Sequence, residues 1–162
     1  MNQASASPPA SVQPIRASLA LRKKLAKLGL YGNADLIVHL PLRYEDETRL
    51  CPIRAAPIGV PVQVEATVLS SEIKFRPRRQ LLVQVEDKSG SLYLRFFNFY
   101  PNQQAMLAPG ARLRFFGEIR DGFFGAEMVH PRFAKVDEAT PLPKTLTPVY
   151  PTTAGVAQSA LR

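Results

Sequence analysis

The sequence predicts a mainly β fold in which five short strands close into a small barrel. Two observations lead to this prediction. Apolar and polar residues alternate in five segments between residues 59 and 135, and such alternation is the pattern of half-buried strands. A short segment of helical character separates the third of these strands from the fourth.

The five strands follow one another with turn signals between them. The predicted strands are VPVQVEATV at 60–68, LLVQVED at 81–87, LYLRFFNF at 92–99, ARLRFFGEIR at 111–120 and FFGAEMVH at 123–130. PNQQAMLAPG at 101–110 predicts the short helix. Five strands with a helix in this place are typical of the oligonucleotide/oligosaccharide-binding (OB) fold. An SH3-like barrel is the alternative, and the helix favours the OB-fold barrel.

The residues on either side of the barrel have a different composition. The first fourteen are small, polar and proline-rich, which is typical of disorder. Leucines then recur at helical spacing, at Leu21, Leu25 and Leu28, after Ser18 as a suitable N-cap. The predicted domains are a disordered tail at 1–14, a small N-terminal helical hairpin with a connecting loop at 15–58, the OB-fold barrel at 59–135 and a proline-rich extended C-terminal linker at 136–162.

Composition limits the classes of function. The 162 residues carry a formal net charge of +8, which attracts polyanions, either nucleic acid or an anionic membrane surface. The single cysteine, Cys51, excludes an intramolecular disulfide and a four-ligand zinc site of cysteine and histidine. No apolar run reaches the roughly 18 residues of a membrane span, and MNQASASPPA lacks the regions of a secretory signal. We therefore expect a cytoplasmic protein without membrane association.

Signals for catalysis are poor. The sequence contains no G-x-x-x-x-G-K-[ST] phosphate loop, and His39 and His130 are interpreted as structural residues. The acidic residues of RYEDETRL at 43–50 alternate with arginines, which predicts a loop held by local ion pairs. We expect this segment to carry no catalytic site and no cofactor.

A basic loop joins the first two predicted strands. SSEIKFRPRRQ at 70–80 contains four cations with one aromatic residue among them: Lys74, Phe75, Arg76, Arg78 and Arg79. The loop in this position borders the nucleic-acid groove of OB-fold barrels, and an aromatic residue among arginines suits base stacking beside phosphate contacts. The simpler alternative is a solvated loop.

The third predicted strand is apolar on both faces. Alternation places Leu92, Leu94 and Phe96 in the core and therefore places Tyr93, Arg95, Phe97 and Phe99 on the outer face. Exposed aromatic rings there would stack on unpaired bases, and Arg95 would contact a phosphate or stack. Arg114 and Phe116 repeat the outward pattern on the fourth strand. The alternative is that the helical hairpin or the proline-rich segment covers these rings.

Four motifs, in this order, resemble the wedge domain of the RecG family of ATP-dependent DNA helicases. They are HLPLRYEDETR at 39–49, LRFFNF at 94–99, FGEIRDGFFGAEMVHP at 116–131 and LTPVYPTTAGVAQSALR at 146–162. The resemblance runs from about residue 18 to the last residue. It implies a fragment, because the family's two motor domains, which use ATP and Mg²⁺, would follow Arg162.

The resemblance also implies a function. The family's wedge splits strands at the branch point of stalled replication forks and Holliday junctions, in recombination and DNA repair, while the motor pulls duplex DNA. By the family's pattern, Phe97 would stack on the base at the branch point, and Tyr100 stands where a second stacking aromatic would lie. Branched DNA and the motor domains in cis are the expected partners of a monomer.

Two other functions fit the residues. An OB-fold protein-interaction module would use its exposed aromatics to bind a partner chain, and its binding would be insensitive to salt. A general binder of single-stranded nucleic acid would bind linear single strands and forks equally well. The basic loop favours a nucleic-acid ligand, and the family motifs favour branched DNA.

Overall fold

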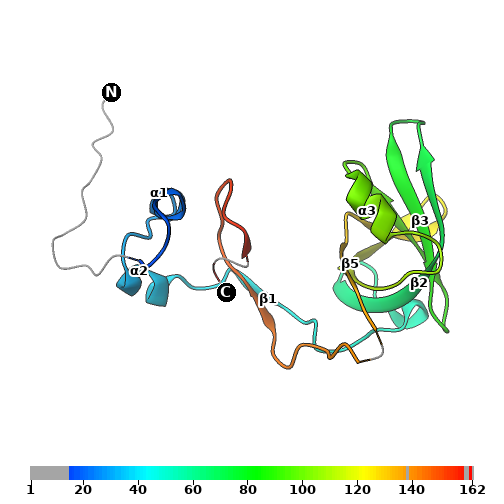
Figure 1. The fold of residues 1–162 in the computed structure, drawn as a ribbon. Coiled ribbons are helices and arrows are strands. Elements are labelled where there is room, and N and C mark those ends of the chain that lie inside the picture. The colour runs from blue at the N-terminus through cyan, green and yellow to red at the C-terminus, as the bar shows by residue number, and fades with distance from the viewer. Residues whose placement is uncertain (1–14, 138, 159–160, 162) are drawn as a thin grey trace. The chain divides into compact units, whose positions relative to one another are not determined.

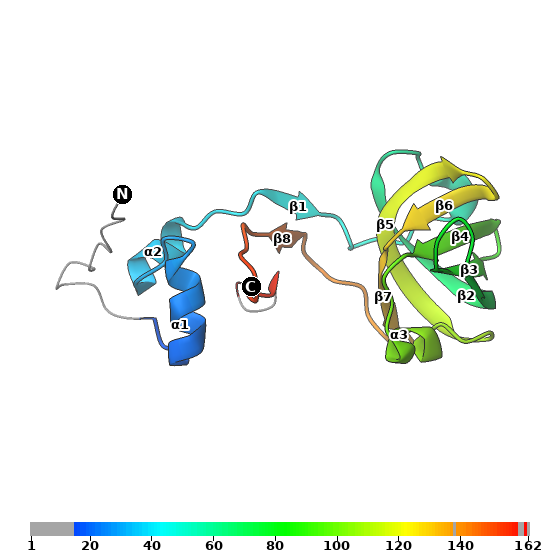
Figure 2. The same cartoon turned by 90° about the horizontal axis from the view of Figure 1, so that it is seen from above.

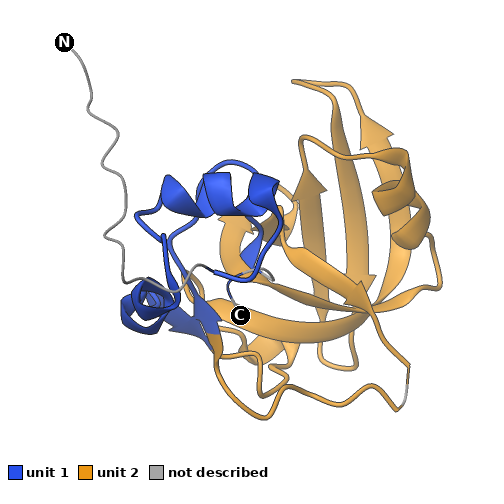
Figure 3. Cartoon of the chain, turned by 60° about the vertical axis from the view of Figure 1, so that its left-hand side comes forward, with its two compact units in different colours: residues 1–45, 148–162 blue, residues 46–147 orange. Residues whose placement is uncertain are grey.

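The computed structural model describes residues 15–137, 139–158 and 161, so the disordered tail expected at 1–14 lies outside the described residues. The chain forms two compact units, one of residues Met1–Glu45 with Pro148–Arg162 and the other of residues Asp46–Thr147 (Figure 3). The predicted domain boundaries stay predictions, because a compact unit is not by itself a domain that folds alone.

The larger unit is a closed barrel of the OB-fold type. Its elements are β2 (Pro61–Lys74), β3 (Gln80–Glu86), β4 (Ser91–Phe96), α3 (Pro101–Met106), β5 (Arg112–Gly122), β6 (Gly125–Val129) and β7 (Arg132–Lys135). The sheet order is β2-β3-β4-β6-β5-β7, and the pairing of β2 with β5 closes the barrel (Figures 1 and 2). β4 and β6 run parallel, while the other paired strands are antiparallel. The predicted mainly β fold is confirmed, with α3 between the third and fourth barrel strands.

Two predicted strands have other bounds in the structure: the third ends at Phe96 and the fifth begins at Gly125, so Phe123 and Phe124 lie in the turn before it. Two further features of the barrel differ from the prediction. β2 does not end near residue 68: after a bulge between Val68 and Ser70 it continues to Lys74, because its second half pairs with β3 as far as Gln80. The basic loop is therefore shorter than expected and lies at the tip of a long β2–β3 hairpin (Figure 1). β7 was not predicted as a strand, and it adds to the barrel by pairing with β5.

The core of the barrel follows from the alternation in the sequence. Every second side chain of a strand points to the same face, so each strand contributes a row of apolar residues. The fully buried side chains of the barrel include Val64, Val68, Leu81, Val83, Val85, Leu92, Leu94, Leu113, Phe115 and Met128. Burying a Val, Leu, Phe or Met side chain contributes roughly 1.5–3 kcal/mol each, so this row-by-row packing fixes which strand faces point outward.

A turn built on Asp87 connects β3 to β4. Its carboxylate accepts hydrogen bonds from the backbone N–H groups of Ser89 (2.7 Å), Gly90 (2.9 Å) and Ile53 (2.9 Å), and from the Ser89 hydroxyl (2.6 Å). The bond to Ile53 ties the short 3-10 helix η1 (Ile53–Ala55) to the barrel. Partial burial by itself raises the pKa of Asp87, but these hydrogen bonds outweigh it and hold the pKa below its usual value.

In its described residues the smaller unit contains two short helices and a two-stranded sheet. Its elements are α1 (Leu19–Ala26), α2 (Asn33–Val38), β1 (Arg43–Glu45) and β8 (Thr147–Val149), and β1 pairs with β8. The Ser18 hydroxyl accepts a hydrogen bond from the Leu21 N–H (3.3 Å), as predicted for the N-cap of α1. A small core brings together Ile15, Leu25, Leu30 and Val156. No helix in the described part of the chain combines the length and the apolar character needed to cross a bilayer.

We expect Asp87→Asn to lower the free energy of unfolding by about 1–3 kcal/mol at pH 7, because charge-assisted hydrogen bonds are lost. The folded-state pKa of Asp87 is lowered, so its contribution is present above the usual pKa of an aspartate and is lost as the pH falls through the folded-state value. Urea unfolding at pH 7 and at pH 3 measures both effects. The exposed Asp121→Asn is the matched control, and an equal loss of stability in the two variants at pH 7 would contradict the role given to Asp87.

Candidate nucleic-acid interface

The outer face of β4 carries two of the side chains that the sequence predicts there. Tyr93 and Arg95 are half-buried on this face. The strand ends at Phe96, and Phe97, also half-buried, lies in the bend that follows. Phe99 is only 8% exposed and packs in the barrel core. The prediction that Phe99 faces outward is therefore wrong, because the alternation on which it depends ends with the strand.

The Phe97 ring contacts both a cation and another aromatic ring. The guanidinium carbon of Arg78 lies over the Phe97 ring, 3.5 Å from its centroid. The ring of His130 lies 5.6 Å from the Phe97 ring at an interplanar angle of 55°. The Phe97 N–H also donates a hydrogen bond to His130 Nε2 (3.2 Å), so both the backbone and the ring of Phe97 are fixed.

His130 is the residue that positions Phe97, and its backbone conformation is unusual. It follows β6 with φ of 50°, the left-handed region that costs a residue with a side chain about 1–2 kcal/mol. Its N–H donates to the Arg95 carbonyl (2.8 Å), which continues the pairing of β6 with β4. Its ring also meets Phe96 edge-on. Nothing in the sequence marks this contact, because a histidine before a proline carries no signal for a positive φ.

The basic loop lies beside the same end of β4. The residues from Lys74 to Arg79 are all exposed, and the Phe75 side chain is 71% exposed. The guanidinium carbon of Arg79 lies 4.2 Å from the centroid of the Phe99 ring, next to the contact of Arg78 with Phe97. Lys74 pairs with Glu72. The structure therefore brings Arg78 and Arg79 together with Phe97, while Phe75 and Arg76 extend from the same loop.

Arg95 is part of a polar network in the middle of the outer face. Its guanidinium pairs with Glu127 (2.6 Å) and donates a hydrogen bond to Gln80 Oε1 (2.7 Å). The side chain is only 14% exposed. A phosphate contact by Arg95 would have to compete with this ion pair. We therefore expect the network mainly to keep the outer face rigid between Tyr93 and Phe97.

The two tyrosines of the predicted site lie in different surroundings. Tyr93 packs against Phe124 of the β5–β6 turn, with ring centroids 5.6 Å apart. Tyr100 precedes α3, and its N–H donates a hydrogen bond to Gln103 Oε1 (3.0 Å). The Tyr100 side chain is 72% exposed. Both positions leave aromatic surface accessible from outside the barrel.

The outward pattern predicted for the fourth barrel strand does not leave free side chains. Phe116 is 7% exposed, with the guanidinium of Arg132 from β7 over its ring. Arg114 pairs with Glu65 (2.7 Å) and donates hydrogen bonds to the carbonyls of Thr140 and Pro141. The prediction of exposed stacking residues here is wrong, because β7 and the segment after it cover this part of β5.

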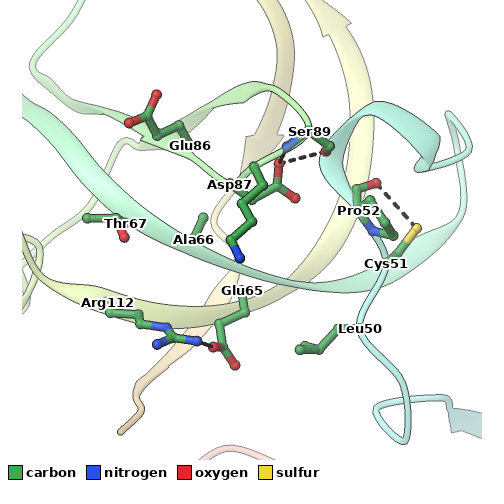
Figure 4. Close-up of a pocket in the computed structure, with 11 residues that line it drawn as sticks. Leu50, Cys51, Pro52, Glu65, Ala66, Thr67, Glu86, Asp87, Ser89 and Arg112 are labelled. Carbon is green, nitrogen blue, oxygen red and sulfur yellow. Dashed lines mark hydrogen bonds and ion pairs between the residues drawn. The ribbon is translucent and has the colours of Figure 1, made fainter. Parts of the chain in front are cut away.

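An open pocket lies elsewhere on the barrel, and two of its three carboxylates, Glu65 and Asp87, already have partners. Leu50, Cys51 and Pro52 line it together with Glu65, Asp87 and Arg112 (Figure 4). Glu65 pairs with both Arg112 and Arg114. Burial by itself raises the pKa of Glu65, and the two arginines outweigh it and lower the pKa. The described residues contain no group of three or more His, Cys, Asp or Glu that could hold a metal ion. The surface around Phe97, where aromatic rings and arginines lie together, is the stronger candidate site.

Comparison with known proteins agrees with the geometry. A family model for the RecG wedge domain matches residues 16–162. The ATP-dependent DNA helicase RecG of Escherichia coli (strain K12) is 50% identical over 145 residues, which cover 88% of this chain and 21% of the relative. The RecG of Pasteurella multocida (strain Pm70) is 40% identical over the same length. The chain thus spans about a fifth of the length of these curated relatives.

One solved structure shares the fold over nearly the whole chain. It is a RecG bound to a three-way DNA junction, 21% identical, with a TM-score of 0.74. The match covers 99% of this chain and 23% of that chain.

The conformation of His130 gives a test of how Phe97 is positioned. At most positions glycine is less stable than alanine by roughly 0.5–1 kcal/mol, but at a positive φ the order reverses. We expect the variant His130→Gly to be more stable than His130→Ala, with a free energy of unfolding higher by about 1 kcal/mol. Urea denaturation of the two variants measures this difference. Lys135→Gly and Lys135→Ala, on the exposed strand β7, provide the comparison. A more stable alanine at position 130 would show that the residue does not adopt this conformation.

Proposed function

Because this chain belongs to the RecG wedge domain family, we propose that it binds branched DNA and separates strands at the branch point. The observation that carries the proposal is the clamped ring of Phe97 beside the basic loop. A ring held in place at the edge of a barrel provides a stacking surface, and the arginines next to it provide charge for phosphates.

The contact of Arg78 with Phe97 suggests how the base is received. A cation–π contact at an exposed site is worth about 0.5–1 kcal/mol, whereas stacking of a base on an aromatic residue is worth about 1–3 kcal/mol. The base at the branch point therefore replaces the guanidinium on the Phe97 ring. Arg78 then pairs with a neighbouring phosphate, so the exchange is favourable for both partners.

The remaining residues of the site have graded roles. Arg76, Arg79 and Lys74 contact phosphates of the separated arm, and Phe75 at 71% exposure offers a further stacking ring on the loop. Tyr100 stacks on the nucleotide next to the branch point. Tyr93 and Arg95 lie further along β4, where Tyr93 offers a ring and Arg95 keeps the floor of the face rigid through Glu127.

The activity of the longer protein follows from its relatives. We propose that motor domains in cis, which use ATP and Mg²⁺, pull duplex DNA across this wedge at stalled forks and Holliday junctions during recombination and DNA repair. We propose that the chain acts on DNA in the cytoplasm. We also propose that it acts as a monomer.

The smaller unit offers a surface on which the motor domains would pack. Five apolar side chains from α2 to β1 are between 60% and 80% exposed: Ile37, Val38, Leu40, Leu42 and Tyr44. A group of exposed apolar side chains of this kind is typical of a surface that contacts another protein part.

Fluorescence anisotropy with a three-way fork, a linear duplex and a single strand tests the proposed function. We expect tighter binding of the fork than of either linear DNA, with affinity falling steeply as salt rises. Equal binding of the single strand would make the chain a general single-strand binder. Binding to none of the three would favour a protein-interaction module.

Phe97→Ala should weaken fork binding about 5- to 150-fold, because one stacking contact of about 1–3 kcal/mol is lost. The ring is half-buried and outside the core, so we expect the free energy of unfolding to fall by less than about 1 kcal/mol. Phe97→Tyr keeps the ring and should keep the affinity. Unfolding of the alanine variant under conditions where Phe97→Tyr is folded would contradict the assignment of Phe97 to the outer face.

Arg78→Ala should act on the salt dependence. Loss of one phosphate contact lowers the slope of log K against log salt by about 0.7–0.9. The affinities of wild type and Arg78→Ala for the fork, measured at four or more salt concentrations by anisotropy, give the two slopes. Arg54→Ala, an exposed arginine on η1, is the control. Identical slopes for wild type and Arg78→Ala would remove Arg78 from the phosphate contacts.

A further inference from the structure

The turn between β5 and β6 exposes two phenylalanines at its tip. Phe123 is 91% exposed and Phe124 is 51% exposed. Their rings meet edge to face with centroids 5.0 Å apart, and Phe124 also packs on Tyr93 of β4. These three residues, Tyr93, Phe123 and Phe124, form what we call the second aromatic platform.

The turn between β5 and β6 is a tight turn flanked by two glycines. Gly122 pairs with Gly125, which leaves Phe123 and Phe124 as the two residues of the turn. Gly125 has φ of 115°, and a Cβ on Gly122 would overlap the side chain of Glu127. Turns of this length usually carry Asn, Asp, Gly or Ser at these places, so two phenylalanines add nothing that the turn itself requires. Their exposure points to a ligand.

The second aromatic platform lies on the same outer face as Phe97 but at a distance from it. Tyr93 and Phe97 are four residues apart along β4 and the bend after it, and a strand rises about 3.3 Å per residue. The three steps from Tyr93 to Phe96 therefore span about 10 Å and Phe97 follows in the bend, so the two sites are too far apart for one base to contact both. The Arg95–Glu127 ion pair lies on the outer face between these two sites. The face thus has two stacking sites joined by a rigid polar strip.

We propose that the second aromatic platform stacks an unpaired base further along the single-stranded arm whose first base lies on Phe97. This inference rests on the proposed function. A nucleic-acid occupant is favoured because the platform continues the face that begins at the basic loop, and because loops in both of these places bind oligonucleotides in OB-fold barrels. The turn itself, GFFG at 122–125, carries no cation, so the contact is with bases and not with phosphates.

The experiment compares two forks that differ only in the length of one single-stranded arm. An arm of about two nucleotides reaches Phe97 alone, and an arm of about twelve nucleotides spans the whole face of an OB fold. The variant is Phe123→Ser/Phe124→Ser, and Phe123→Tyr/Phe124→Tyr is the control that keeps both rings. Thermal unfolding by circular dichroism checks that each variant is folded.

We expect the serine variant to lose about 5- to 150-fold in affinity for the long-armed fork and nothing for the short-armed fork. The slope of log K against log salt should be unchanged, because no phosphate contact is lost. The tyrosine control should bind both forks like wild type. Equal affinity of wild type and the serine variant for the long-armed fork would overturn the inference and assign the turn to a protein partner.

The design separates this inference from the proposed function. If wild type prefers neither fork to a linear duplex, the proposed function itself fails. If wild type prefers both forks but the serine variant behaves like wild type on each, only the second aromatic platform fails.

Discussion

The parallel pairing of β4 with β6 is the constraint on which the candidate site depends. It joins β2, β3 and β4 to β6 and β5 in one sheet and sets Arg95 opposite Val129, so that His130 follows at the end of β4. From there His130 accepts the hydrogen bond of the Phe97 N–H and supports its ring. The same pairing sets Tyr93 opposite Glu127 and allows Glu127 to pair with Arg95. Without this pairing, His130 would not lie beside the bend after β4. The backbone and the ring of Phe97 would then lose the contacts with His130 that hold them in place.

Weak cation–π contacts hold the basic loop against the barrel. In the free chain, Arg78 and Arg79 lie over the rings of Phe97 and Phe99. Each such contact is worth about 0.5–1 kcal/mol when exposed, which holds the basic loop near the barrel without locking it. Stacking of a base on Phe97 and pairing of a phosphate with Arg78 would together be stronger than the contact of Arg78 with Phe97. We therefore expect the proposed binding to rearrange the loop and to leave the barrel as it is.

Much of the barrel could be predicted because the alternation of apolar residues is a local signal. It placed Leu92 and Leu94 in the core and Tyr93 on the outer face, as the structure does. The failures lie where the local signal ends. Phe99 turns inward because β4 stops at Phe96. Phe116 is covered because β7 pairs with β5 and brings the Arg132 side chain over the Phe116 ring.

The site was predictable only in part for a related reason. Aromatic residues and arginines are visible in the sequence, but their partners are not. That Arg95 pairs with Glu127, and that Phe97 meets both Arg78 and His130, depends on strands distant in sequence being brought together by the closure of the barrel. The role given to Phe97 rested on its place before Asn98 in a family motif, and the clamp around its ring is what the structure adds.

The most direct test of this account is a fork that carries the fluorescent base 2-aminopurine at the branch point, titrated with the chain. Stacking of the base on Phe97 predicts a change in its fluorescence on binding. The change should be absent when the variant Phe97→Ala is added at concentrations that saturate the fork. The same fluorescence change with Phe97→Ala as with wild type would show that the base lies elsewhere, and would contradict the central claim.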